Sequence, residues 1–364
     1  MCSTTDKNKK QFTNKKKKYL NLLKPPGFSV SLSNIITYTI HLQHHIASMV
    51  RTSNVSGTFI ASKNRLAEGP TYDARTHRFY WVDITNNQIN WIEYDDPETI
   101  HRVKTNHPVG VIALTSQPNK LLVGAKLGFG FVDLTTPIET AEIDYVLKVH
   151  TEEPDASELR FNDGYVDAKG RFYAGSMVDL GFEEKPIGKL YCFDFSKNTA
   201  NVVETGLTVP NGMGWSPDNK IMYHTDSPRS TIYQYDYDLE TGAMTNRRVF
   251  VKVNFEGVAV PEPDGLCVSQ DGSVWTAIFS TSTVQRYSPQ GELLEEITFP
   301  APRVTCPALV GPNYNELVVT SMSLYNERPN YHELAKTEQG EGGNLFKTVL
   351  DGVVGIPRNL VNID

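Results

Sequence analysis

Four polar residues occupy the same place in a phrase that the chain repeats. They are Glu68 in AEGPTYD, Asn162 in RFNDGYVD, Asn211 in VPNGMGWSPD and Asp264 in PEPDGLCVSQD. Carboxylate and amide oxygens are the ligands that hard cations prefer in proteins. If the phrases surround one axis, the four side chains converge, and the sequence predicts a cation site at the point where they meet.

The distance from each polar residue to the following turn supports this shared position. Three of them stand eight positions before a turn residue: the pairs are Asn162 and Gly170, Asn211 and Asn219, and Asp264 and Gly272. Glu68 joins the set if its turn, DARTHR, is one residue longer. A single Asn-Gly or Asp-Gly step usually marks only a turn. Three in register, with a glutamate at the matching step of a fourth phrase, favour a metal site.

The phrase consists of two short apolar strands around a polar turn, and it occurs six times. The copies begin at Glu68, Val109, Asn162, Asn211, Asp264 and Cys306, about 40 to 53 residues apart. Each is followed by a further alternating segment: NQINWIEYD, GFGFVDLTT, GKLYCFDF, STIYQYDYD, STVQRYSP or GGNLFKTVL. This period is typical of propellers with four strands per blade. The sequence predicts an all-β, six-bladed β-propeller whose metal site lies at one end of the central channel.

The other two copies of the phrase offer poor ligands at the matching step. They present Val109 with Gly110, and Thr305 with Cys306. The predicted site is therefore lopsided, and such a site leaves coordination positions open for water and substrate, as catalytic metal sites require.

Charge divides the chain into two parts. The net charge is −7, but residues 1–48 carry eight Lys against one Asp, which leaves about −14 on the remainder. An acidic body argues against a nucleic-acid partner, whose phosphates require clustered Lys and Arg. We predict a basic, disordered extension over residues 1–54 and the propeller over 55–364. The apolar stretch in the extension is interrupted by polar residues, so we expect no membrane partner.

The four cysteines, Cys2, Cys192, Cys267 and Cys306, show no CxxC or other metal-ligand spacing. Two of them fall on predicted strands among apolar neighbours, which is typical of buried free thiols in a reducing compartment. Together with the absence of a recognisable secretory signal, this predicts a cytoplasmic protein. Oligomeric state is left open by the sequence.

Taken together, these phrases resemble the gluconolactonase, regucalcin and luciferin-regenerating-enzyme family, also called the senescence marker protein family, of six-bladed propeller lactonases. The resemblance runs from about residue 59 to 358 and includes RFNDGYVDAKGRFYAGSM, YDYDLETGAMTNRRVF, PDGLCVSQDGSVW and GGNLFK. It implies hydrolysis of a sugar lactone to the aldonic acid, with the lactone as the small-molecule partner.

The resemblance also implies roles for particular residues. It implies one divalent cation held by Glu68, Asn211 and Asp264, and a substrate contacted by Arg160 and Asn162. A further acidic contact falls in AGSMVDLGFEEKPIGKL, where the spacing departs from the family. Three residues there are candidates, namely Asp179, Glu183 and Glu184, and we predict Glu184. The departure puts the identity of the substrate in question rather than the reaction.

The residue types permit this chemistry. A cation can polarise the lactone carbonyl, and oxygen and amide ligands alone do not decide among Ca, Zn, Mg and Mn. Asp264 is the predicted catalytic residue, because a carboxylate can accept a proton from the attacking water and return it to the ring oxygen. Glu68 has the same chemistry available.

Other interpretations of the sequence remain. A calcium-binding, regucalcin-like regulatory protein with incidental lactonase activity is the main alternative. Covalent catalysis is disfavoured because GxSxG is absent and Ser227 has no recognisable partners. We expect packing or surface roles for His150 and His224, which do not open axial strands. The same holds for the strand aromatics Trp81, Phe172, Tyr173, Trp215 and Trp275, which we expect between blades rather than in a sugar platform.

Overall fold

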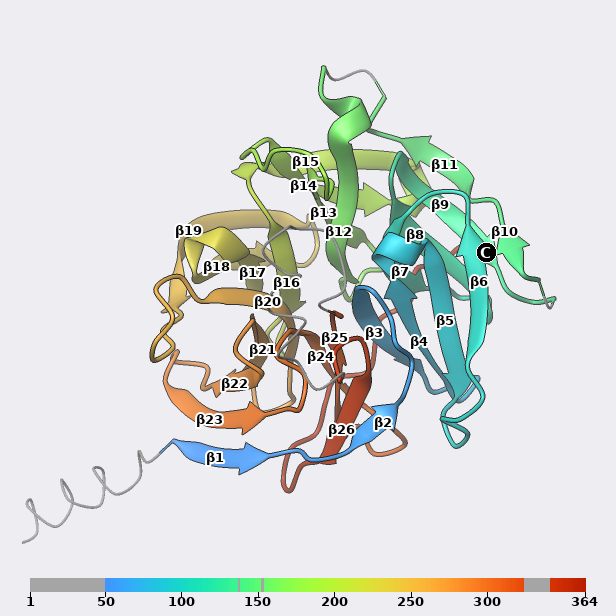
Figure 1. The fold of residues 1–364 in the computed structure, drawn as a ribbon. Coiled ribbons are helices and arrows are strands. Elements are labelled where there is room, and N and C mark those ends of the chain that lie inside the picture. The colour runs from blue at the N-terminus through green and yellow to red at the C-terminus, as the bar shows by residue number, and fades with distance from the viewer. Residues whose placement is uncertain (1–49, 137, 152–153, 324–340) are drawn as a thin grey trace, which may run out of the picture. The chain divides into compact units, whose positions relative to one another are not determined.

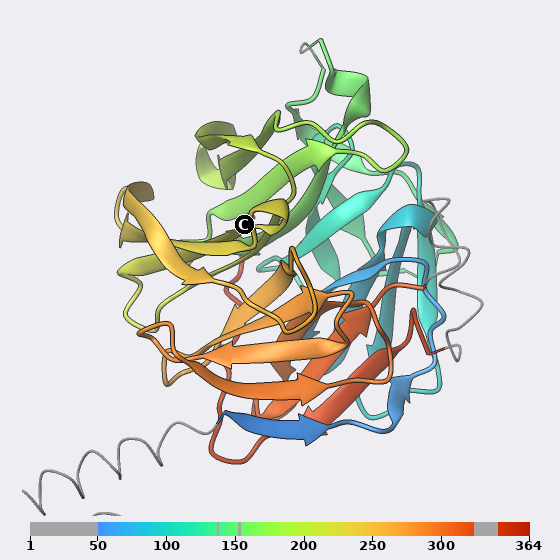
Figure 2. The same ribbon diagram turned by 60° about the vertical axis from the view of Figure 1, so that its left-hand side comes forward.

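The computed structural model describes residues 50–136, 138–151, 154–323 and 341–364. Its strands form six sheets of four or five strands each. The sheets stand side by side around a common axis (Figures 1 and 2). The predicted all-β, six-bladed propeller is therefore confirmed. The basic segment predicted for residues 1–54 lies almost wholly outside the described residues.

The first three blades follow one another along the chain. Blade 1 contains β3 (Ala67–Asp73), β4 (Arg78–Asp83), β5 (Gln88–Glu93) and β6 (His101–Thr105), with β10 (Thr140–Ala141) at its outer edge. Blade 2 contains β7 (Val109–Leu114), β8 (Lys120–Ala125), β9 (Gly128–Asp133) and β11 (Asp144–Lys148). Blade 3 contains β12 (Leu159–Val166), β13 (Phe172–Val178), β14 (Gly188–Asp194) and β15 (Thr199–Leu207).

Of the last three blades, the fourth is continuous in the sequence, whereas the fifth and sixth also take a strand from the start of the described chain. Blade 4 contains β16 (Pro210–Trp215), β17 (Ile221–Asp226), β18 (Thr231–Asp238) and β19 (Ala243–Lys252). Blade 5 contains β20 (Glu262–Val268), β21 (Val274–Phe279), β22 (Thr283–Tyr287), β23 (Leu293–Thr298) and, at its edge, β1 (Arg51–Asn54). Blade 6 contains β24 (Val304–Val310), β25 (Glu316–Ser321), β26 (Leu345–Val349) and β2 (Thr58–Ile60).

Each repeated phrase supplies the first two strands of a blade, and each segment that follows it supplies the third. The innermost strands lie next to one another in chain order, and β24 lies against β3, which closes the ring. The innermost strands of all six blades are buried on both faces, apart from a few half-buried residues. Near-continuous apolar sequence is expected for strands enclosed in this way.

Residues near the start of the described chain complete the last blades. Ile60 on β2 pairs with Leu345 on β26, so the outer strand of blade 6 comes from far away in the sequence. Residues 51–54 form β1 and pair in parallel with β23. These four residues lie inside the segment that the sequence analysis assigned to the extension. They belong to blade 5.

Aromatic side chains fill the spaces between blades, as predicted. Trp81 and Trp275 are fully buried, and Tyr173 packs edge-on against Trp215 with ring centroids 5.3 Å apart. Large aromatics dominate the energetics of such cores, and truncating one to Ala typically costs about 3–5 kcal/mol.

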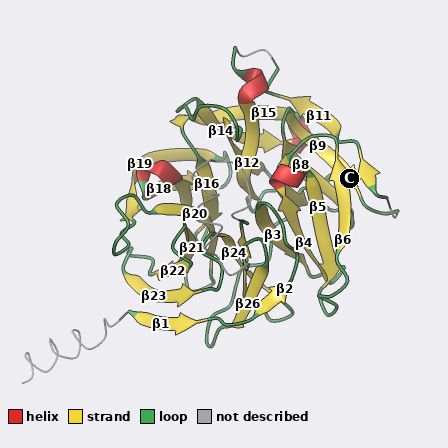
Figure 3. Ribbon diagram, viewed as in Figure 1, coloured by secondary structure: helices red, strands yellow, loops and turns green. Residues whose placement is uncertain are grey.

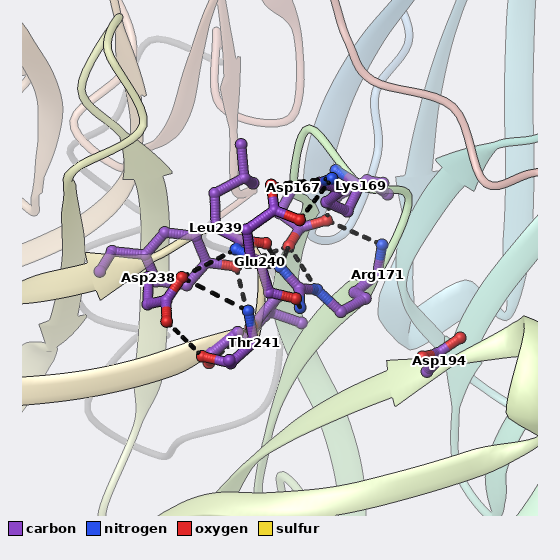
Figure 4. A network of polar contacts seen from close by, with 12 residues as sticks. Asp167, Lys169, Arg171, Asp194, Asp238, Leu239, Glu240 and Thr241 are labelled. Atoms are coloured by element: carbon purple, nitrogen blue, oxygen red, sulfur yellow. Dashed lines mark hydrogen bonds and ion pairs between the residues drawn. The ribbon is translucent and has the colours of Figure 1, made fainter.

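A polar clamp joins blades 3 and 4 at their turns (Figure 4). Arg171 donates from Nε to Asp167 Oδ2 at 2.7 Å and from Nη2 to the Leu239 carbonyl at 2.5 Å. Tyr237 donates its hydroxyl to the same Asp167 oxygen. Asp167 is completely buried and Arg171 nearly so. Their ion pair lies within the β12–β13 turn, and the bonds to Leu239 and Tyr237 tie that turn to blade 4.

Residues 353–364 cross the end of the propeller where the innermost strands finish. Val361 exchanges backbone hydrogen bonds with Leu114 and Ser116 of blade 2, and Gly355 bridges Ser269 of blade 5. Arg358 donates to the Pro70 carbonyl at 2.9 Å and stacks over the Tyr165 ring. This end of the channel is therefore covered, and the polar residues that open the strands lie at the other end.

Helical structure in the described residues is limited to single turns (Figure 3). The four 3₁₀ turns are η1 (Ile84–Asn86), η2 (Ala156–Glu158), η3 (Phe195–Lys197) and η4 (Ser227–Arg229). None of the helices in the described ranges is both long and apolar enough to span a membrane.

Candidate metal and substrate site

One cavity of about 140 Å³ lies at the end of the channel where the innermost strands begin. All six predicted site residues line it: Glu68, Arg160, Asn162, Glu184, Asn211 and Asp264. Five come from the innermost strands β3, β12, β16 and β20, and the sixth comes from the loop after β13. The structure thus brings together side chains that are up to 196 positions apart, between Glu68 and Asp264. Their chemical roles stay predictions.

A β-bulge places three of these side chains in the cavity. On β12, β16 and β20 the ladder skips two residues, and the first skipped residue is Asn162, Asn211 or Asp264. A bulge bends its strand and re-aims a side chain, and bulges are common beside functional sites.

Glu68 differs from the other three by one step along its strand. On β3 the skipped residues are Gly69 and Pro70, so Glu68 is the last paired residue before the bulge. Thr71 is the first residue after this bulge, and His77 is the residue of the following turn that has a positive φ. The two are six positions apart, and the corresponding residues in the other three blades have the same separation. The turn is therefore not longer, and that expectation was wrong. Glu68 stands one position earlier on its strand than the other three residues do on theirs, and its longer side chain still reaches the cavity.

Two buried aspartates hold the chain just before the metal-ligand candidates. Asp83, at the end of β4, accepts hydrogen bonds from the backbone N–H groups of Arg65 and Leu66 at 3.0 and 3.1 Å. Asp226, at the end of β17, accepts from those of Thr208 and Val209 at 3.2 and 3.0 Å. In both blades the two N–H groups belong to the residues two and three positions before the ligand candidate. A buried aspartate therefore fixes the backbone just before Glu68 and just before Asn211.

The carboxylates of the cavity repel one another. Burial raises the pKa of Glu68 well above its usual range, and the negative charge of Asp163 adds to the shift. Burial likewise raises the pKa of Asp264, with further contributions from Glu68, Asp163 and Glu262. Burial also raises the pKa of Asp163 itself. Several acidic groups enclosed in one small space favour a compensating positive charge.

Arg160 is buried beside this cluster and is held on two sides. Its Nε donates to Asp179 Oδ1 at 2.8 Å, and its Nη1 donates to Asn162 Oδ1 at 2.8 Å. Asp179 also pairs with Lys126 at 3.2 Å. Among the described residues, no hydrogen bond engages Nη2 of Arg160, which leaves this nitrogen for a ligand.

The three acidic candidates in the loop after β13 differ in their position relative to the cavity. Only Glu184 lines the cavity, and its side chain is exposed at the mouth. Asp179 is committed to Arg160 and Lys126. Glu183 is exposed and does not line the cavity. Glu184 is thus the one of the three that lines the cavity, and its contact with a substrate stays a prediction.

Sequence reasoning missed several residues of the cavity wall. Glu262 lines it two positions before Asp264, and period-2 alternation along β20 could have indicated it. Ser227 lines it from η4. Met177 and Phe279 contribute apolar wall, and no sequence pattern distinguished them from ordinary strand residues.

Thr305 and the two histidines that were not expected to bind a cation make hydrogen bonds to other groups of the protein. Thr305 is fully buried and donates its hydroxyl to the Ala67 carbonyl at 2.7 Å. His224 contacts Glu204 through Nδ1 at 3.1 Å, and His150 donates from Nδ1 to the Lys126 carbonyl at 2.8 Å. Neither histidine lines the cavity.

The residues present fit a divalent cation by their chemistry. In the part of the chain that the structure describes, no group of three or more His, Cys, Asp or Glu side chains is placed to hold a metal. The predicted set is of another kind, because it combines the carboxylates of Glu68 and Asp264 with the amide oxygen of Asn211. Oxygen ligands of mixed charge are typical of calcium and magnesium sites.

Comparison with known proteins gives a consistent result. Residues 66–323 match the family model described as "SMP-30/Gluconolactonase/LRE-like region". The chain is 34% identical over 315 residues to the cell growth-regulated gene 1 protein of Candida albicans, covering 79% of this chain and 91% of that protein. It is 31% identical over 304 residues to regucalcin of Danio rerio, covering 82% of this chain and 95% of that protein.

Solved structures show the same fold. A luciferin-regenerating enzyme superposes with a TM-score of 0.73 at 27% identity, covering 83% of this chain and 97% of that one. A regucalcin from Agrobacterium tumefaciens, described as a calcium-binding protein, superposes with a TM-score of 0.74 at 22% identity, covering 86% and 99%. At that identity the second match shows the fold alone. The family model and the curated relatives together show that the chain belongs to the SMP-30/gluconolactonase/LRE-like family.

Proposed function

We propose that the protein hydrolyses a sugar lactone to the aldonic acid with a divalent cation held by Glu68, Asn211 and Asp264. The observation that carries this proposal is that two buried, mutually repelling carboxylates face one cavity together with an amide and the guanidinium of Arg160. Membership of a family whose description includes gluconolactonases supports the reaction class.

The cavity suits a small substrate. Its volume of about 140 Å³ lies below the 300–1,000 Å³ of sites for drug-sized ligands. Its lining combines polar groups that can bind hydroxyls with the apolar side chains of Met177 and Phe279. A monosaccharide lactone combines hydroxyl groups with an apolar ring face and matches this arrangement in size and character.

In this proposal Asp264 moves the proton. Its carboxylate accepts a proton as water attacks the carbonyl carbon, and returns it to the ring oxygen as the ring C–O bond breaks. A divalent cation held by Glu68, Asn211 and Asp264 would supply positive charge to polarise the carbonyl and to stabilise the negative charge that develops on the carbonyl oxygen. Ca, Zn, Mg and Mn all accept such oxygen ligands.

The remaining residues orient the lactone. Arg160 offers Nη2 to the substrate while Asp179 holds its Nε. Asn162 provides a polar contact for a polyol beside it, and Glu184 accepts hydrogen bonds from hydroxyls at the cavity mouth. Positioning of this kind accounts for a large part of catalysis in ordinary enzymes.

A calcium-binding regulatory role is the second candidate. It is favoured by the ligand set, which contains only oxygen atoms, as calcium sites do. The two functions share the cation site and differ in catalytic efficiency. A kcat/KM far below ~10⁴ M⁻¹s⁻¹ on every lactone offered supports the regulatory role, because ordinary enzymes exceed that value.

The deciding experiment is a pH-drop assay of arabinono-, xylono-, galactono-, rhamnono- and gluconolactones against Ca, Mg, Mn and Zn. We expect acid release with at least one lactone, loss of that release with EDTA, and recovery when the cation is returned. Activity that survives complete chelation contradicts the proposed mechanism.

A further inference from the structure

A chain of hydrogen bonds runs through the cavity wall in a single direction. Arg160 Nη1 donates to Asn162 Oδ1 at 2.8 Å, and Asn162 Nδ2 donates to Asn211 Oδ1 at 3.1 Å. Asn211 Nδ2 then donates to Ser227 Oγ at 2.9 Å, and Ser227 Oγ donates to the Pro263 carbonyl at 2.6 Å. The last acceptor is the residue next to Asp264.

Both ends of this chain have a fixed polarity. A guanidinium can only donate, and a backbone carbonyl can only accept. Asn162 therefore turns its oxygen toward Arg160 and its nitrogen away, where the nitrogen also donates to the Pro210 carbonyl at 3.1 Å. Since the single hydroxyl proton of Ser227 is given to Pro263, Ser227 can only accept from Asn211. The amide of Asn211 consequently has one allowed orientation.

That orientation matters because the two ends of an asparagine amide differ. The oxygen can bind a cation, whereas the NH₂ group repels one. In an unsupported asparagine the two orientations compete. Ser227 is buried, lies at the first position of η4, and follows Asp226, which is itself fixed by backbone N–H groups. Ser227, which selects the Asn211 orientation, is thus adjacent to Asp226, the residue that also holds the backbone just before β16.

We propose that Ser227 is a positioning residue that fixes Asn211 with its oxygen available to the cation. The inference rests on the proposed cation site and adds a residue to it. Partners that orient metal ligands in this way are worth about 10- to 100-fold in metal affinity. Ser227 acts through Asn211 and needs no contact with the cation or the lactone.

The first test measures cation affinity by calorimetry, using whichever of Ca, Mg, Mn and Zn the wild-type protein binds most tightly. We expect Ser227→Ala to weaken that affinity about 10- to 100-fold. Ser227→Thr keeps the hydroxyl and is expected to restore it to within about threefold. Thermal melting of both variants without cation checks that they are folded. Equal affinity in wild type and Ser227→Ala overturns the proposal.

The second test separates positioning from a local structural effect. In Asn211→Asp both ends of the side chain are oxygen, so there is no wrong orientation for Ser227 to exclude. We expect Ser227→Ala to change the cation affinity of Asn211→Asp by less than about threefold, against 10- to 100-fold in the Asn211 background. The same fold-change in both backgrounds means that Ser227 supports η4 rather than the amide, and overturns the proposal.

Failure of the cation site itself gives a different result. If the wild-type protein binds none of the four cations, the proposed function fails. If it binds one and Ser227→Ala binds it equally well, only the positioning role of Ser227 fails.

Discussion

Arg160 and Asp179 form an ion pair in which Nε lies 2.8 Å from Oδ1, with the guanidinium buried and the carboxylate half-buried. The pair links β12 to the loop after β13, and it holds the guanidinium with Nη1 on Asn162. Asp179 was one of three acidic residues that the sequence offered as substrate contacts. Its side chain instead prepares Arg160, so its contribution to substrate binding is indirect.

Removing Asp179 should therefore weaken substrate binding. We expect Asp179→Ala to lower kcat/KM by about 10- to 100-fold, chiefly through KM, because hydrogen bonds to charged groups contribute about 1.5–3 kcal/mol. Steady-state kinetics on the best lactone of the screen measure this. Glu183→Ala, in the same loop but outside the cavity, is the matched control and should behave as wild type. Unchanged kinetics in Asp179→Ala contradict the role given to the pair.

Asp264 should be needed for the reaction. Asp264→Asn keeps the size of the side chain but removes proton acceptance and one anionic ligand. We expect kcat to fall by at least about 10²-fold, the lower end of what acid–base catalysis contributes. Asp236→Asn, on the outer part of blade 4, makes the same chemical change and should retain activity. A value of kcat within threefold of wild type for Asp264→Asn is incompatible with the mechanism.

The clamp between blades 3 and 4 should contribute to stability and not to binding. Arg171→Met leaves the buried Asp167 carboxylate without its partner, and we expect the free energy of unfolding to fall by about 3–5 kcal/mol. Lys169 lies in the same turn as Arg171 and forms a surface ion pair with Glu240 of blade 4 (Figure 4). Lys169→Met breaks this pair and should lower the free energy of unfolding by less than about 1 kcal/mol. Urea denaturation measures both. Similar losses in the two variants are the outcome that contradicts a dominant buried pair.

Glu204 should make stability depend on pH in acid. Burial alone would raise its pKa, but hydrogen bonds and charge from His224, Tyr235 and Arg247 outweigh burial and lower the pKa below the ordinary 4.5. A carboxyl group with a lowered folded-state pKa stabilises the protein above its unfolded value and loses that effect as pH falls through the folded value. We expect Glu204→Gln to cost about 1.5–3 kcal/mol at pH 7.

That cost should shrink as the pH is lowered from about 5 toward 3. Urea midpoints at several pH values measure the change. Glu292→Gln removes an equivalent charge from an exposed position in blade 5 and serves as the control. A difference between wild type and Glu204→Gln that stays constant from pH 7 to pH 3 refutes the assignment.

Much of the fold was predictable because the repeat is local. The six phrases fix two strands each, and the alternating segments fix the third. The outer strand of blade 6 was not predictable in this way, because β2 is three residues long and its partner is at the far end of the sequence. A short segment without its partner carries no periodicity by which it can be recognised.

In the candidate site, too, the sequence identified some features and could not show others. Shared position in the repeat identified Asn162, Asn211 and Asp264, and the structure places them on matching bulges. Ser227 could not be identified as a partner of Asn211, because their relationship is a hydrogen bond across the start of a blade. The sequence shows which residues can do chemistry, and it does not show which atoms they turn toward one another.

The pairing of β2 with β26 also sets an order of events during synthesis. Ile60 and its partner Leu345 are 285 positions apart. At 5–20 residues per second the ribosome needs about 15–60 s to cover that distance. For that time β2 has no strand to join, while the sequences of the five preceding blades emerge complete. The ring is therefore completed only after β26 has emerged, when the last blade receives a strand that was made before the innermost strand of any blade.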